Sequence, residues 1–96
     1  MAVTVITAGA TANGATAAVT VPESRCYTIQ VLPQGATVDI EVSVDGTNFF
    51  KPSASRFDVN IHASVGYSLV DRPVQKMRIF VSNYTSGTIT ASVINS

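Results

Sequence analysis

Hydrophobic and polar residues alternate with a period of two along most of this chain. The clearest run covers residues 56–62, where Phe57, Val59 and Ile61 share one face and polar side chains occupy the other. Residues 38–44 alternate in the same way. Nowhere does an apolar pattern recur at the helical period, which is about 3.6 residues. The pattern therefore predicts an all-β protein with no helix of note.

Turn-forming residues divide the alternating runs into about eight short strands. Asn13 with Gly14, and Asp45 with Gly46, are pairs typical of tight hairpin turns, and the four prolines all fall between runs. We expect one domain over residues 1–96, a single antiparallel β-sandwich that is jelly-roll-like or immunoglobulin-like. The expected strands are residues 2–8, 15–21, 25–32, 37–44, 48–51, 56–63, 65–70, 75–83 and 87–94, where 48–51 either stands alone or continues its neighbour.

The alternation also predicts which side chains form the hydrophobic core between the two sheets. These are Tyr27, Ile29, Val31, Ile40, Val42, Phe57, Val59, Ile61, Met77, Ile79, Val81, Ile89 and Val93.

Charged residues are scarce, at 12% of the chain, which is about half the usual share. Thr, Ser, Ala and Asn fill the outward strand positions instead. Such a surface suits packing against another protein, and a solvated Thr-rich sheet face is the alternative. The net charge is zero and the basic residues form no stripe, so we expect no nucleic-acid partner. No apolar run is long enough to cross a membrane, so we expect no membrane partner.

The single cysteine and single histidine limit the chemistry of the chain. Cys26 lies on the strand face opposite Tyr27 and is expected to be a half-buried free thiol, and His62 is expected at the surface. One cysteine cannot form a disulfide within the chain, which indicates folding in a reducing cytoplasm. One histidine and one cysteine do not supply a structural zinc site, so no metal or cofactor is predicted.

Three carboxylates, Asp39, Glu41 and Asp45, share one face of a predicted hairpin. They do not straddle a bond as glycoside hydrolysis requires, and their spacing matches no calcium loop. We expect a solvated acidic strip that pairs across strands with Lys76 and Arg78. No catalytic residue is predicted.

Exposed aromatic residues are the best candidates for contact with a partner, because interface cores are enriched in them. Phe80 lies on the strand face away from the predicted core, where it is either exposed or covered by the second sheet or the N-terminal segment. The predicted partner contacts are Phe80, Phe50, Tyr84, Lys76, Arg78, Asp39 and Glu41.

Two segments resemble small β-sandwich structural proteins of tailed bacteriophage virions, and capsid cement or decoration proteins in particular. They are VDGTNFF at residues 44–50 and MRIFVSNYTSGTITASV at residues 77–93. The resemblance covers roughly the C-terminal half. It implies a protein of the virion, made in the host cytoplasm, that bridges subunits on the capsid surface. Its partners would be the major capsid protein and further copies of itself, with a trimer favoured. No functional residue carries over.

Other functions fit parts of the same pattern. The hairpin is also similar to that of discoidin-like jelly rolls, with Phe49 where those modules carry Trp. A small carbohydrate-binding β-sandwich would stack sugars on Phe50, Tyr84 or Tyr67, with Asp45 and Asn48 as polar contacts. A phage tail or head–tail connector component is a further alternative. An enzyme is not expected, because no acid–base or nucleophile pair is visible.

Overall fold

All regular elements of the described chain are β-strands. The computed structural model describes residues 3–52, 55–57, 61–70 and 73–95, and these ranges contain no helix, so none that could span a membrane. The all-β prediction is confirmed. The strands are β1 (Val3–Ala10), β2 (Gly14–Ala15), β3 (Val19–Thr20), β4 (Cys26–Leu32), β5 (Thr37–Ser43), β6 (Arg56–Phe57), β7 (Val65–Val70), β8 (Lys76–Ser82) and β9 (Ile89–Asn95).

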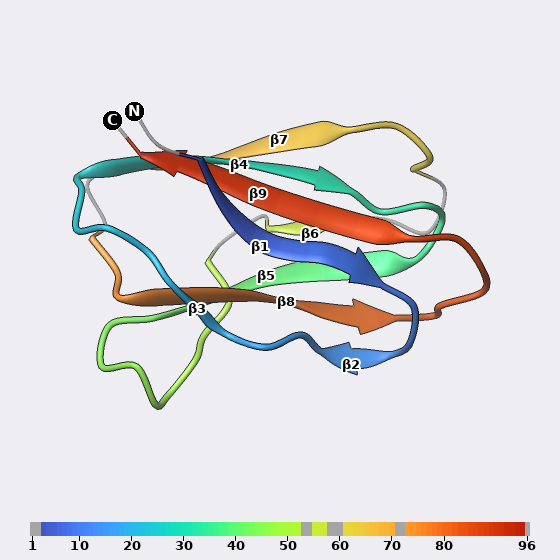
Figure 1. Cartoon of the computed structure of the whole chain (residues 1–96), viewed down its shortest axis with the longest axis horizontal. Helices are drawn as coiled ribbons and strands as arrows, with labels where there is room; N and C mark the ends of the chain where they lie inside the picture. The colour runs from blue at the N-terminus through green and yellow to red at the C-terminus, as the bar shows by residue number, and fades with distance from the viewer. Residues whose placement is uncertain (1–2, 53–54, 58–60, 71–72, 96) are drawn as a thin grey trace.

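The strands form two antiparallel sheets that pack face to face as a β-sandwich (Figure 1). Sheet A has the order β1-β9-β4-β7, and sheet B has the order β2-β8-β5-β6, with β3 also paired to β8. The chain crosses between the sheets at every connection except β2–β3 and β5–β6. This order is that of a jelly roll, in which the last strand lies beside the first. An immunoglobulin domain instead pairs its first two strands within one sheet.

Three of the expected strands are much shorter than the alternation predicts, whereas the ends of the others agree within two residues. Residues 15–21 form two short strands, because the Thr16 hydroxyl takes the place of a ladder partner and accepts the Ile79 N–H at 3.2 Å. Residues 48–51 contribute a single bridge, between Phe50 and Val42, before Pro52 removes a backbone donor.

The third difference concerns the clearest alternating run of the sequence. Only Arg56–Phe57 is a strand, and residues 61–63 are not, so the single strand expected over 56–63 is wrong there. Residues 58–60 lie outside the described part of the chain. The Ile61 carbonyl accepts a hydrogen bond from the Gly35 N–H at 2.9 Å, which ties this segment to a turn rather than to a sheet.

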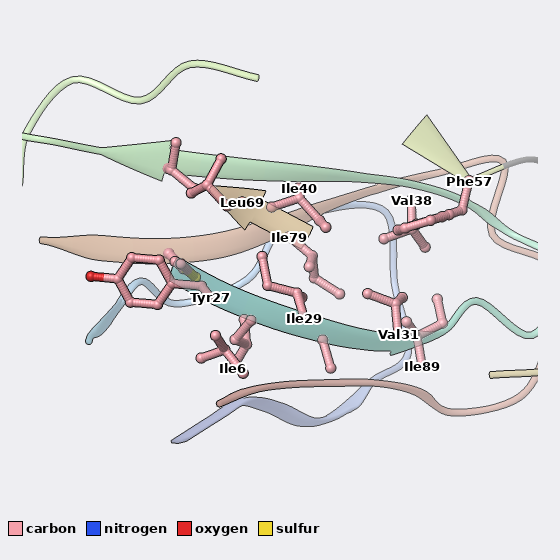
Figure 2. Packing of buried hydrophobic residues seen from close by; sticks show 14 of the residues in the cluster. Ile6, Tyr27, Ile29, Val31, Val38, Ile40, Phe57, Leu69, Ile79 and Ile89 are labelled. Carbon is pink, nitrogen blue, oxygen red and sulfur yellow. The ribbon is translucent and has the colours of Figure 1, made fainter. Parts of the chain in front are cut away.

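The core lies between the sheets, where Ile29 and Val31 of β4 face Ile40 of β5 and Ile79 of β8 (Figure 2). Most of the predicted core is buried, but Ile61 is half-buried and Val59 lies outside the described residues. A register shift in β1 turns one further residue inward that simple alternation misses, namely Ile6. The other buried apolar residues that the prediction missed are Val21, Ala36, Val38, Leu69, Val74 and Ala91.

Candidate functional site

The connection from β5 to β6 forms an arm that folds back along the edge of sheet B beside β5, and its side chains reach over the outer face of that sheet. Val42 and Phe50 exchange two backbone hydrogen bonds of 2.9 Å at its base. The neighbouring Phe49 ring then lies over Arg78, with 4.0 Å between the guanidinium carbon and the ring centroid. Arg78 also donates to Glu41 at 2.7 Å. The charges of Arg78 and Glu41 are therefore engaged within the chain, by a cation–π contact and an ion pair.

A second ion-pair network lies on the same outer face, around Asp39. This carboxylate is only 2% exposed. Arg56 of β6 donates to both of its oxygens, at 2.9 and 3.3 Å, and the Lys51 ammonium lies 3.4 Å away. The arm thus supplies Lys51, and the next strand supplies Arg56, to neutralise a buried charge.

The predicted acidic strip is therefore only partly right. Glu41 does pair across strands with Arg78, as expected. Asp39 is neither solvated nor paired with β8, because the strand register places it opposite Phe80 on one side and Arg56 on the other. Lys76 lies opposite Ser43, which is itself buried.

Asp45 holds together the turn at the tip of the arm. One of its carboxylate oxygens accepts the N–H groups of Thr47 and Asn48, both at 2.8 Å, and the Ser43 hydroxyl at 3.0 Å. The other accepts the Asn48 side-chain amide at 2.9 Å. Gly46 follows with a φ of 82°, a left-handed conformation that glycine adopts without strain. The carboxylate oxygens that the sugar-binding alternative would use as polar contacts thus accept hydrogen bonds from the turn itself.

These hydrogen bonds favour the ionised form of the side chain. The N–H of Asn48, followed by that of Thr47, holds the pKa of Asp45 well below its usual range. Because the folded-state pKa is lowered, the stabilisation is complete above the unfolded value of about 4 and is lost as the pH falls below it.

Asp45→Asn is therefore expected to lower the melting temperature at neutral pH and to matter less at acid pH. The amide cannot carry the charge that the backbone donors stabilise, whereas wild type loses that charge only in acid. Melting curves of wild type and variant, recorded from neutral to acid pH, measure the difference between their melting temperatures. The titration of the other carboxylates affects both proteins alike and cancels from this difference. A difference that stays constant with pH would contradict this role for the ionised side chain.

The aromatic partner-contact candidates lie on different parts of the fold. Phe80 is 37% exposed on the outer face of sheet B, and Phe50 is 40% exposed at the margin of that sheet. Tyr84 is half-buried beyond the other end of β8, where its hydroxyl donates to the Gly87 carbonyl at 2.6 Å. Tyr67 lies in sheet A on the core side of β7. Phe50, Tyr84 and Tyr67 therefore do not form one stacking platform.

The outer face of sheet A is the most distinctive surface of the molecule. All charged strand residues in the described chain belong to sheet B, and β1, β4, β7 and β9 contain none. The alternation in the sequence shows which residues point outward but not which strands share a sheet, so it could not reveal this uncharged face. The residues at its outward positions are Val3, Val5, Cys26, Thr28, Gln30, Leu32, Gly66, Ser68, Val70, Thr90, Ser92 and Ile94.

This face carries two hollows, one on either side of Gln30. Small side chains such as Ser92 and Thr28 line them. Cys26 lies at the end of the face and is half-buried with a free thiol, as predicted. Because many of its side chains are small, the face allows another protein surface to approach closely.

The described residues contain no arrangement suited to metal binding. No group of three or more His, Cys, Asp and Glu side chains comes together within them. His62 is exposed beside Gly35, at the surface as expected. Comparison of the chain with family models, with curated proteins and with solved structures finds no match.

Proposed function

We propose that this chain is a structural protein of a tailed-phage virion, a capsid cement or decoration protein that binds the major capsid protein. The observation that carries the proposal is the uncharged outer face of sheet A. The centres of protein interfaces are depleted of charged residues, whereas a solvated sheet face normally carries them. We therefore assign the capsid contact to this face.

The other sheet supports the same assignment. The outer face of sheet B is partly covered by the chain's own arm, and its charges at Asp39, Glu41 and Arg78 are engaged there. A jelly roll occurs in viral capsid proteins and in lectins alike, so the fold by itself does not decide between them. Phe50, Tyr84 and Tyr67 lie on different parts of the fold, so the sugar-binding alternative would have to rely on one of these rings alone, which favours the capsid proposal.

The size of the face indicates how the protein would bind. Four strands spaced about 4.8 Å apart and about 20 Å long cover roughly 400 Å². A stable interface buries about 800 Å² on each partner. One subunit is thus expected to bind weakly, and a homo-oligomer to bind tightly because several faces engage the lattice together.

Thr28→Glu tests the proposal. Thr28 is exposed at the centre of the face, between Ile94 and Ser68 on the neighbouring strands. A carboxylate there would be buried unpaired in the complex, so we expect affinity for phage heads to fall at least about tenfold. The measurement is co-sedimentation with heads that lack the protein, together with their resistance to heat.

Thr85→Glu is the matched control, because Thr85 is exposed in the β8–β9 turn and lies on neither sheet face. It should bind heads as wild type does. The proposal fails if wild type binds heads no better than an unrelated particle. Binding to purified tails and not to heads would contradict the capsid assignment, and undiminished binding of Thr28→Glu would contradict the assigned face.

A further inference from the structure

The sheet edges of this fold differ in how they are protected against pairing with another chain. Natural proteins protect edges by short strands, charges, prolines and bulges. In sheet B the edge strands β2, β3 and β6 are two residues long, and β6 also carries Arg56. In sheet A the β1 edge has two register shifts, next to Thr7.

The β7 edge has none of these features within the described chain. Val65–Val70 pairs with β4 in continuous register over six residues, without a bulge, a charge or a proline. No other described strand pairs with it, and Figure 1 shows β7 at the margin of the molecule. In such an antiparallel edge, alternate backbone N–H and C=O groups point away from the sheet.

Gly66 leaves the outer face of β7 without a side chain beside this edge. Glycine weakens a strand, and within strands it often marks the close approach of another backbone. Nothing inside the chain requires it here. A Cβ added at Gly66 would meet only the Ile29 carbonyl oxygen, at 4.0 Å, and its φ is not left-handed.

We infer that β7 pairs antiparallel with β7 of a second copy of this chain, about a two-fold axis. A pair of identical antiparallel strands is self-complementary under such an axis. Residues directly opposite each other must point to the same side of the joined sheet. The register centred on Ser68 satisfies this condition and places the exposed Val70 of each copy opposite Gly66 of the other.

The pairing joins two four-stranded sheets into one of eight strands. The pairing involves only residues 66–70 of each copy. Asp71 and Arg72, which follow in sequence, lie outside the described chain. The two uncharged outer faces become continuous and reach roughly 800 Å² together, the area a stable interface buries on one partner. The result is a dimer, in contrast to the trimer that the phage resemblance favours.

Ser68→Lys tests the inference with the isolated full chain. Ser68 is exposed, and in the proposed register the two copies of residue 68 face each other across the axis. Two lysines there repel, so we expect the dimer dissociation constant to rise by roughly tenfold or more. Ser68→Glu should do the same, and an equimolar mixture of the two variants should restore association as a heterodimer. Sedimentation equilibrium over a wide concentration range measures each.

Ser92→Lys is the matched control, because Ser92 points outward from a central strand of the same sheet. It should self-associate as wild type does. The inference is overturned if wild type remains monomeric at every concentration, or if Ser68→Lys associates normally. It is also overturned if Ser92→Lys is equally disruptive, which would indicate face-to-face stacking. None of these outcomes depends on capsid binding, so the proposed function stands or falls separately.

Discussion

Ile79→Ala is expected to lower the free energy of unfolding by roughly 3 to 4 kcal/mol. Ile79 is fully buried in the middle of β8, opposite Ile40, and faces the β4 side chains of the other sheet (Figure 2). Removing three carbons there loses their transfer free energy and leaves a cavity that two rigid sheets cannot close. A domain of this size has a total stability of about 5 to 15 kcal/mol, so a large share would be lost.

Urea denaturation followed by circular dichroism measures this effect. Val44→Ala is the control, since Val44 is an aliphatic residue near the base of the arm and is 56% exposed. Its truncation should change stability by no more than about 0.5 kcal/mol. Similar losses in the two variants would show that Ile79 does not lie in a close-packed core.

The second large effect is expected on removing the cations around Asp39. Changing both Lys51 and Arg56 to Met keeps the aliphatic cover over the carboxylate but leaves its charge unpaired. Breaking a buried ion pair from one side costs about 3 to 5 kcal/mol. Because both cations are partly exposed and water screens them, we expect about 2 to 3 kcal/mol. Chemical denaturation of the double variant tests this value.

A third substitution tests whether the unpaired charge of Asp39, and not another effect of the two Met substitutions, causes the loss of stability. Asp39→Val in the same background removes the unpaired carboxylate and introduces a β-branched side chain suited to a strand. Stability should return to within about 1 kcal/mol of wild type, because apolar replacements of buried ion pairs are often neutral. If the triple variant is no more stable than the double variant, Asp39 is not a buried charge that requires neutralisation.

Central strands were predicted well from the sequence because alternation records which face of a strand is buried. β4, β5, β8 and β9 each have neighbours on both sides, and their inward residues form most of the core. The edge strands β1 and β7 of sheet A were also predicted within two residues. The segments at the edges of sheet B, residues 15–21, 48–51 and 56–63, were predicted poorly, because their pairing depends on the partner and not only on their own pattern. Residues 61–63 alternate with their neighbours in sequence but lie beside a turn near Gly35.

The surfaces were the hardest part to predict. The alternation identified the outward residues but not the sheet to which each belongs, so the separation of charge between the sheets stayed hidden. The arm over sheet B rests on contacts between residues far apart in sequence, Phe49 with Arg78 and Lys51 with Asp39. Within the sequence of the arm itself, only the adjacent Phe49 and Phe50 after the Asp45 turn indicated that this segment packs against the sheet.

The position of β9 has a consequence for the order in which the protein folds. This strand comes last in the chain, yet it lies between β1 and β4 at the centre of sheet A. Until Ile89–Asn95 leaves the ribosome, β1 has no partner in its own sheet and β4 has only β7. Pairings between such distant segments form slowly, and unpaired strands are prone to aggregation. The pairings that join β1 and β4 through β9 can therefore form only after all the strands that precede β9 have been synthesised.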